Sequence, residues 1–412
     1  MSNVTRVVRS LATVGPKRTV YLVRRRLFPG SHNTAEVLVP PQMLRDIDWT
    51  VAPTFATAPR KVQGSPVKVA WISSPPSPAS GGHQNLFRFI KAMETAGYDC
   101  TVYFWDWQGS RVDGDAMRAM LAPISAYPDL DAEFLPYEGA VSRDTDAIVA
   151  TAWETAYASF LDPSAARRFY FVQDFEPWFY PAGPNAVLAE NTYRFGFHGL
   201  TAGGWLSHHL NQSYGMSADH FDFSADTTMY RVTRQQDRPG IFFYARPETP
   251  RRAYELGVAI LERVHELAPE IPLHFAGSTR KDDGLVLPVV DHGAVDLTHL
   301  NDIYNECSAA LVLSLSNMSL LPLELIAAGV VPVVNDAANN RMVSENSFID
   351  YQPLVVERMA TALIHHATRE RPAVEFDQMT ASVAGRTWED SGRQFVDHFA
   401  RELARQPESD AG

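Results

Sequence analysis

The hydrophobic residues of this chain form short continuous runs, and most runs are followed by a loop and a segment with helical periodicity. The first clear case is VKVAWISSPPSPASGGHQNLFRFIKAMETAGYDCTVYFW, residues 67–105. It predicts a buried strand over 67–72, a glycine-containing loop, an amphipathic helix and a second strand over 100–104. A helix that joins two strands in this way makes them parallel, so we expect a parallel sheet.

The same alternation continues along the chain. TDAIVATAW and RRFYFVQDFEP each predict a strand, and FGFHGLTAGGWLSHHLNQSYG predicts a strand and a helix. The polar stretch TRQQDRPG, residues 233–240, interrupts this pattern and is typical of a linker between domains. A second alternation of strands and helices follows it and ends in a helix within residues 387–404.

Two successive alternations of this kind predict an α/β protein with two doubly wound, Rossmann-like domains that face one another across an interdomain cleft. The expected boundaries are a basic arm and extended lead-in (1–64), an N-terminal domain (65–232), a linker (233–240), a C-terminal domain (241–384), and a final helix that packs back across the cleft, with a tail (385–412).

The net charge excludes one class of binding partner, and the two cysteines indicate the cellular compartment. The 412-residue chain has a formal net charge of −12 and a pI near 5.5. Nucleic acid is therefore excluded as the main partner, because binding to phosphates needs a clustered basic surface. Cys100 and Cys307 lie in separate apolar segments, and we expect two reduced, buried thiols in a cytoplasmic protein.

The first thirty residues differ from the rest, because they carry seven Lys or Arg residues and no Asp or Glu. These charges interrupt every apolar run that could serve as the core of a secretory signal, and no stretch is long enough for a membrane span. Two interpretations stay open. The arm packs on its own acidic protein, or it rests as an amphipathic segment on anionic lipid at the inner face of the cell membrane.

One carboxylate stands out in SLSNMSLLPLELIAAGVVPVVND, residues 314–336. Strands are expected over 309–315 and 330–334, with a helix between them that begins near Ser319 and has Pro322 in its first turn. Glu324 then lies about one turn into the helix, near the carboxyl ends of the strands, where open α/β sheets bind ligands. Glu324 either accepts hydrogen bonds from ribose hydroxyls or is a first-turn glutamate favoured by the helix dipole.

This stretch resembles the nucleotide-sugar site of the family 4 glycosyltransferases of GT-B fold, in which two glutamates are separated by seven residues. Glu324 matches the second glutamate, and Ala327, Ala328 and Gly329 follow it as in that family, whereas Ser316 stands at the first position. The resemblance implies that Glu324 binds ribose and that residue 316 faces the donor sugar. It further implies that Ser319 and Leu320 line the same donor site.

FFYARPETPRRAYELGVAIL resembles the segment of that family in which an Arg and a Lys hold the donor diphosphate. Arg246 matches the Arg, and Arg251 or Arg252 replaces the Lys, with Arg252 preferred. A diphosphate leaving group needs cations. The alternative for the adjacent pair is a solvated arginine cluster at the start of a helix.

Two segments of the N-terminal half fit the same family. Gly81, Gly82 and His83 resemble its glycine loop, where the backbone approaches donor phosphates or acceptor; the alternative is a plain turn with a structural histidine. FVQDFEPWFYP resembles the loop of this family in which a pair of polar residues faces the acceptor. Asp174 is the first candidate for the general base and Glu176 the second, although either could instead cap the following turn.

Taken together, VQDFEPWFYP, GGWLSHHL and SNMSLLPLE resemble the WsaF-like rhamnosyltransferases of bacterial surface-glycan assembly over most of residues 65–395. The resemblance implies a dTDP-β-L-rhamnose donor, a glycan or lipid-linked saccharide acceptor, and neither a metal ion nor any other cofactor. Formation of an α-L-rhamnoside from this donor inverts the anomeric centre, which requires a carboxylate base such as Asp174. Two other classes stay open: a sugar-nucleotide epimerase of GT-B fold, and a non-catalytic glycan-binding relative.

Overall fold

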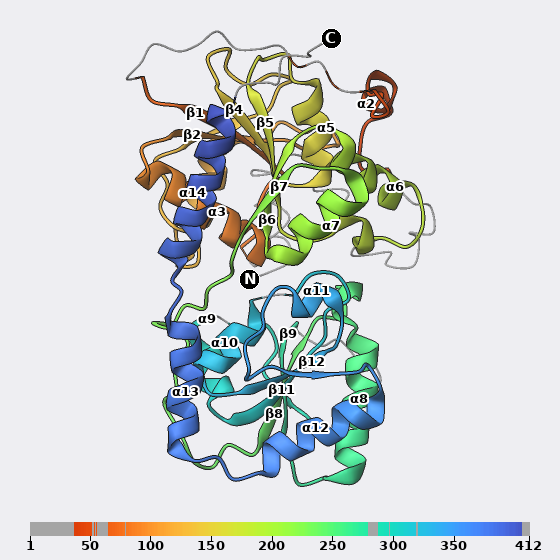
Figure 1. Ribbon diagram of the computed structural model, residues 1–412, viewed down its shortest axis with the longest axis vertical. Helices are drawn as coiled ribbons and strands as arrows, with labels where there is room; N and C mark the ends of the chain where they lie inside the picture. The colour runs from red at the N-terminus through yellow and green to blue at the C-terminus, as the bar shows by residue number, and fades with distance from the viewer. Residues whose placement is uncertain are drawn as a thin grey trace. The chain divides into compact units, whose positions relative to one another are not determined.

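The computed structural model describes residues 37–51, 53, 55, 65–78, 80–278, 287–295, 297–318 and 320–405. Within these ranges the chain forms two compact units (Figure 1). The first contains residues up to Ala202, Leu206–Phe221, and the chain from Gly392 onward. The second contains Gly203–Trp205 and Asp222–Ser391.

The first unit is built on a seven-stranded parallel sheet with the order β3-β2-β1-β4-β5-β6-β7. Its strands are β1 (Lys68–Ser73), β2 (Asp99–Phe104), β3 (Glu133–Pro136), β4 (Ala147–Ala150), β5 (Arg167–Val172), β6 (His198–Ala202) and β7 (Ala218–Phe221). Its helices are α2 (Pro41–Asp46), α3 (Gly81–Thr95), α4 (Gly114–Leu121), α5 (Trp153–Leu161), α6 (Pro184–Asn191), and most of α7 (Gly204–Tyr214) and of α14 (Trp388–Ala404), with the 3-10 turns η1 (Glu176–Phe179) and η2 (Thr192–Arg194). The first residues of α7 and α14 belong to the second unit.

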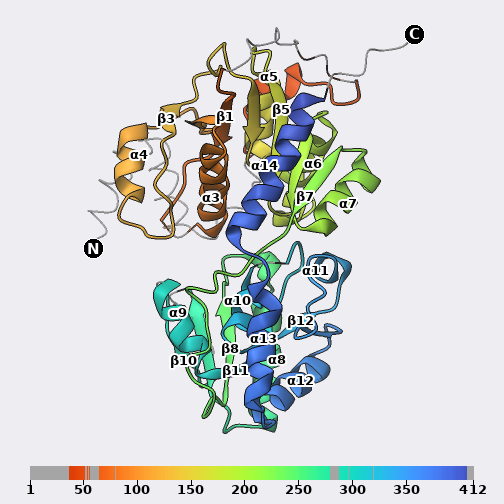
Figure 2. The same cartoon turned by 60° about the vertical axis from the view of Figure 1, so that its left-hand side comes forward.

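Helices α3 and α14 cover one face of this sheet, and α5, α6 and α7 lie on the other (Figures 1 and 2). The apolar side of α3 forms because Leu86, Phe89, Ile90 and Met93 recur at helical spacing and are all buried. Aromatic side chains lie on the face of the sheet that α14 covers. Phe395 stacks on Trp71 of β1 with a centroid distance of 5.9 Å.

The second unit has a six-stranded parallel sheet with the order β10-β9-β8-β11-β12-β13. Its strands are β8 (Gly240–Ala245), β9 (Leu273–Gly277), β10 (Val290–Asp291), β11 (Cys307–Val312), β12 (Val331–Asn335) and β13 (Asp350–Gln352). Its helices are η3 (Pro250–Arg252), α8 (Tyr254–Leu267), α9 (Leu297–Tyr304), α10 (Leu321–Ala327), α11 (Ala338–Arg341), α12 (Val356–Thr368) and α13 (Ala373–Ala384).

Each face of the second sheet has its own hydrophobic core. Leu325 of α10 and Met379 of α13 belong to one core, and Leu261 of α8 and Met359 of α12 belong to the other. Helices on both faces of a parallel sheet define a doubly wound fold. The predicted α/β architecture with two Rossmann-like sheets is therefore confirmed.

The passage from the first unit to the second differs from the expected linker. The chain enters the second unit after Phe221, and residues 233–240 belong to that unit. Arg238 is the reason. Its buried guanidinium donates to the carbonyl oxygens of Tyr304, Cys307 and Ala328 at 3.0, 3.0 and 2.7 Å, which fixes this polar stretch to the core.

Candidate functional site

The carboxyl ends of β8 and β11 mark the switch point of the second sheet. These strands are neighbours, yet the chain leaves β8 toward α8 on one face and leaves β11 toward α10 on the other. Such a divergence opens a crevice at the strand ends, where doubly wound sheets bind their ligands. Arg246 directly follows β8, and Ser314 to Asn317 follow β11. The structure thus brings two of the predicted donor segments to one edge.

Arg246 is held at this edge by Tyr244. Its Nη2 donates to the Tyr244 hydroxyl at 3.0 Å, and its guanidinium carbon lies 5.0 Å from the centre of the same ring. The Nε atom is buried and has no hydrogen-bond acceptor within the described part of the chain. A buried N–H of a cation without an acceptor is costly, and a phosphate oxygen would satisfy it.

Arg252 connects the loops that follow β8 and β11. Its Nη1 donates to Ser314 Oγ at 2.6 Å and to the Asn317 carbonyl oxygen at 3.2 Å. Beside it, the Leu315 N–H donates to the Arg251 carbonyl oxygen at 3.0 Å. Arg252 is therefore part of the frame of the crevice, and its expected contact with a diphosphate stays a prediction.

Ser316 is fully buried at 0% exposure, and its Oγ has no hydrogen-bond partner among the residues that the structure describes. Burying a hydroxyl without a partner costs free energy, so this atom is suited to receive a ligand. Ser319, the next predicted donor residue, lies outside the described residues. Leu320 stands immediately before α10 as its N-cap residue.

Glu324 lies one turn into α10 and is half-buried. Burial is the main reason why the pKa of Tyr304 is raised well above its usual value, and the Glu324 carboxylate is the next cause. The charge of Glu324 therefore acts on Tyr304, the last residue of α9. Gly329, with φ of 74°, ends the helix in the left-handed conformation, and its N–H donates to the Ile326 carbonyl oxygen at 2.9 Å.

In the first unit the glycine loop and the start of α3 form a second cluster. Ser80 caps α3, and His83 Nδ1 lies 2.7 Å from Ser80 Oγ, while its Nε2 lies 3.1 Å from the Ser74 carbonyl oxygen. His83 thus braces the loop. An added Cβ at Gly81 would meet no described atom within 4 Å, and one at Gly82 would meet only Gln173 Nε2 at 3.7 Å. Among the described residues, both glycines therefore have room for a side-chain carbon, so crowding does not explain why glycine stands here.

Gln173 joins the end of β5 to this cluster, because its Nε2 donates to the Gly82 carbonyl oxygen at 3.0 Å. The next residue, Asp174, is 8% exposed, and its Oδ1 accepts the N–H of Phe175 at 2.9 Å. The predicted base and the predicted glycine loop therefore belong to neighbouring segments of one unit.

Glu176 has a different environment from Asp174. Its Oε2 accepts the Trp153 N–H at the start of α5 at 2.6 Å and the Tyr170 hydroxyl at 2.7 Å. Burial is the largest cause that raises the pKa of Glu176 to about 8, and the nearby Glu154 carboxylate adds to it. Glu176 therefore holds the start of α5 to β5, and the assignment of the general base to Asp174 stays a prediction.

One feature near these segments was not singled out from the sequence. Asn335, Asn339 and Asn340 all donate to the Ser314 carbonyl oxygen, and the polar run NDAANN directly after a buried strand is the only signal for them. Trp178 of η1, which the sequence offers either as a residue that stacks on sugar or as part of the core, is 48% exposed.

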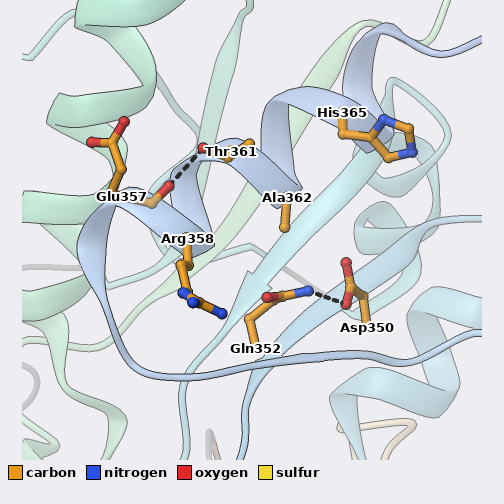
Figure 3. Close-up of a pocket in the computed structure, with 7 residues that line it drawn as sticks. All are labelled: Asp350, Gln352, Glu357, Arg358, Thr361, Ala362 and His365. Carbon is orange, nitrogen blue, oxygen red and sulfur yellow. Dashed lines mark hydrogen bonds between the residues drawn. The ribbon is translucent and has the colours of Figure 1, made fainter.

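Figure 3 shows a pocket of about 420 Å³ on the second unit, away from the predicted donor residues. It is lined by Asp350, Gln352, Glu357, Arg358, Thr361, Ala362 and His365. Both acidic residues already have partners. Glu357 Oε2 lies 2.7 Å from Arg263 Nε, and Asp350 Oδ2 lies 2.8 Å from His366 Nε2. No group of His, Cys, Asp or Glu in the described ranges is arranged to hold a metal ion.

Comparison with known proteins finds a family model that matches most of the second unit. Residues 239–364 match the family model described as "WsaF, C-terminal domain". The chain is also 31% identical over 294 residues to the O-antigen biosynthesis protein RfbC of Myxococcus xanthus. That alignment covers 69% of this chain but only 23% of RfbC, so the chain spans about a quarter of this relative's length.

Solved structures show the same fold at low identity. TarM is 8% identical with a TM-score of 0.67, and the match covers 83% of this chain and 99% of TarM. A putative UDP-N-acetylglucosamine 2-epimerase from Listeria monocytogenes is 10% identical with a TM-score of 0.53, covering 84% and 98%. Together with the family match, these findings confirm the GT-B fold and the resemblance to WsaF-like GT-B glycosyltransferases.

Proposed function

Because this chain has a GT-B fold and its residues 239–364 match the WsaF C-terminal domain model, we propose that it is a hexosyltransferase of bacterial surface-glycan biosynthesis. Similarity to a protein named for O-antigen biosynthesis supports this pathway class. The observation that carries the proposal is the pair of buried polar atoms, Arg246 Nε and Ser316 Oγ, that have no hydrogen-bond partner among the described residues and lie in the segments that follow β8 and β11.

The proposed donor is dTDP-β-L-rhamnose, held by the second unit. Arg246 and Arg252 would face the diphosphate, Glu324 would accept hydrogen bonds from the ribose hydroxyls, and Ser316 would meet the sugar. The sequence resemblance supports the choice of rhamnose, and the positions of Arg246 and Ser316 support the choice of the switch point.

The proposed reaction is a single displacement at the anomeric carbon. A hydroxyl of a saccharide acceptor, bound by the first unit, attacks this carbon and forms the new glycosidic bond, while the bond to the β-phosphate oxygen breaks and dTDP leaves. Asp174 takes the hydroxyl proton, and the arginines stabilise the charge that develops on the diphosphate. The donor is consumed as a co-substrate, and no metal ion or other cofactor takes part in this scheme.

Turnover assays with and without an acceptor test this function against its rivals. A transferase consumes dTDP-β-L-rhamnose rapidly only when a saccharide acceptor is present, and NMR of the product shows an α-linkage. The alternative function is that of an epimerase, which the structural similarity to a putative epimerase from Listeria monocytogenes keeps open. An epimerase converts the donor when no acceptor is present. A non-catalytic relative binds glycans without turnover. Asp174→Asn should lower kcat by about 100-fold or more and leave donor affinity unchanged.

The proposed location is the cytoplasm, at the inner face of the membrane that carries the acceptor. No helix in the described part of the chain is long and apolar enough to cross a membrane. The basic first thirty residues, which lie outside the described residues, would bind anionic lipid. Removal of residues 1–30 should then abolish sedimentation with phosphatidylserine vesicles, and unchanged sedimentation would contradict this contact.

A further inference from the structure

Ser314 is surrounded by asparagine side chains where the loop leaves β11. Its N–H donates to Asn335 Oδ1 at 2.8 Å. Its carbonyl oxygen accepts from Asn335 Nδ2 at 3.0 Å, from Asn340 Nδ2 at 3.2 Å and from Asn339 Nδ2 at 3.4 Å. We name Asn335, Asn339 and Asn340 the asparagine clasp.

The position of Ser314 explains why side chains replace a strand here. The parallel ladder between β11 and β12 ends at the pair Val312 and Val334, so Ser314 lies beyond the last paired residue. Ser314 is nevertheless fully buried, and buried backbone groups need partners. The clasp supplies them from the end of β12 and from α11.

The clasp is itself fixed by its neighbours. Asn340 Nδ2 also donates to the Asn335 carbonyl oxygen at 2.8 Å, and Asn339 Nδ2 donates to Asn340 Oδ1 at 3.2 Å. The Tyr351 hydroxyl on β13 donates to the Asn340 carbonyl oxygen at 3.2 Å. On its other side, Ser314 is held by Arg252 through the 2.6 Å bond to its Oγ. The segment after β11 is thus tied to the elements on both sides of it.

The asparagine clasp supplies more hydrogen-bond donors than the carbonyl oxygen of Ser314 needs. A carbonyl oxygen has two lone pairs, yet three amides converge on it. The three side chains are also neutral, so they fix the segment without adding a cation that would compete with Arg246 for an anionic ligand. Ser316, two residues further, keeps a buried Oγ with no partner among the described residues. A rigid frame beside an unsatisfied buried hydroxyl is typical of a preorganised binding site.

We propose that the asparagine clasp is a positioning device that holds residues 314–318, and with them Ser316 Oγ, in the geometry that receives the sugar of the nucleotide-sugar donor. This inference rests on the proposed function, because it takes the switch point of the second unit as the donor site. The clasp residues do not touch the donor. They act through Ser314 on the segment that does.

The test separates donor binding from acceptor binding. Asn340→Asp keeps the size of the side chain but loses both donated bonds and turns a carboxylate oxygen toward the carbonyl oxygens of Ser314 and Asn335. We expect the Kd and KM for dTDP-β-L-rhamnose to rise about tenfold, the equivalent of one or two lost hydrogen bonds. The KM for the acceptor should stay unchanged. Asn211→Ala, an exposed asparagine on α7, is the matched control and should behave as the wild type.

Asn339→Ala is the second variant, because it removes the longest of the three bonds to Ser314. It should raise the donor KM in the same direction by a smaller factor, and it keeps the proposal testable if Asn340→Asp fails to fold. A folded clasp variant with wild-type donor affinity would overturn the proposal, as would equal rises in the donor KM and the acceptor KM. Failure of the wild type to bind any nucleotide sugar would instead contradict the proposed function itself.

Discussion

Ser316 is the residue where stability and function are expected to oppose one another. Its Oγ is fully buried without a partner among the described residues, so removing the hydroxyl relieves a desolvation cost. Ser316→Ala should therefore raise the free energy of unfolding of the second unit by about 1 kcal/mol while it lowers donor affinity. Urea unfolding and calorimetric titration with the donor measure the two effects.

Ser314→Ala is the matched comparison for this prediction. Its hydroxyl donates to the Asn317 carbonyl oxygen at 2.6 Å and accepts from Arg252, so its loss should destabilise the unit by about 1–2 kcal/mol. If Ser316→Ala instead destabilised the unit to the same degree, its hydroxyl would have a partner that this account lacks.

Glu176 should give the first unit a stability that depends on pH. Its pKa is raised from 4.5 to about 8, so its contribution is fully present below pH 4.5 and is lost as the pH rises through 8. Glu176→Gln is neutral at every pH. Between about pH 5 and 9, the free energy of unfolding of this variant should rise by a few kcal/mol relative to that of the wild type, as a pKa shift of this size implies.

Urea unfolding of the first unit at pH 5, 7 and 9 measures this difference. Glu133→Gln, at an exposed position on β3, is the control and should follow the wild type at each pH. A constant difference between Glu176→Gln and the wild type over this range would show that the Glu176 carboxyl does not titrate there.

The positions of the candidate residues in the fold could be predicted from the sequence better than the contacts that hold them. Arg246 and Ser316 follow buried strands, so their place at the sheet edge could be inferred from the hydrophobic pattern. Glu176 could not be told apart from Asp174, because its partners come from Tyr170 and from the backbone of Trp153. The asparagine clasp was missed since buried asparagines and surface asparagines have the same sequence signature.

At the scale of elements, α10 depends on Gly329 for its termination. Gly329 has φ of 74°, and an added Cβ would lie 2.6 Å from a ring carbon of Phe376. Gly329→Ala should destabilise the second unit by more than the roughly 1–2 kcal/mol that a left-handed conformation alone costs. Gly215→Ala is the control, since Gly215 has φ of 65° but no described atom within 4 Å of the added Cβ. If thermal unfolding showed equal losses of stability in Gly329→Ala and Gly215→Ala, the clash with Phe376 would have no part in the effect.

The strands show which elements a hydrophobic pattern can predict. Every expected strand lies inside a sheet, where both faces are covered and the run is continuously apolar, as in Ala147–Ala150. The strands that the pattern missed are β3, β7, β10 and β13, which are the edges of the two sheets. They are two to four residues long and mostly half-exposed, so their sequences carry too little hydrophobic signal.

At the scale of the whole molecule, the last helix completes the first unit although it follows the second in sequence. Phe395 of α14 lies 5.9 Å from the ring centre of Trp71, and Phe399 lies 4.5 Å from that of Phe169. Phe395→Ala should destabilise the first unit by about 3–5 kcal/mol, as removal of a buried ring usually does. Hydrogen exchange should then rise in β1 and β5 and remain unchanged in β8 and β11. Faster exchange in both units would contradict this assignment of α14.

The central claim is that the switch point of the second unit binds a dTDP-sugar through Arg246. Calorimetric titration of the full chain with dTDP-β-L-rhamnose, UDP-glucose and GDP-mannose tests it most directly, with Arg246→Ala measured beside the wild type. We expect the wild type to bind the dTDP-sugar most tightly and Arg246→Ala to weaken this binding about tenfold or more, as loss of a charge-assisted contact to phosphate does. Equal affinity of the two proteins, or no binding of any of the three donors, would contradict it.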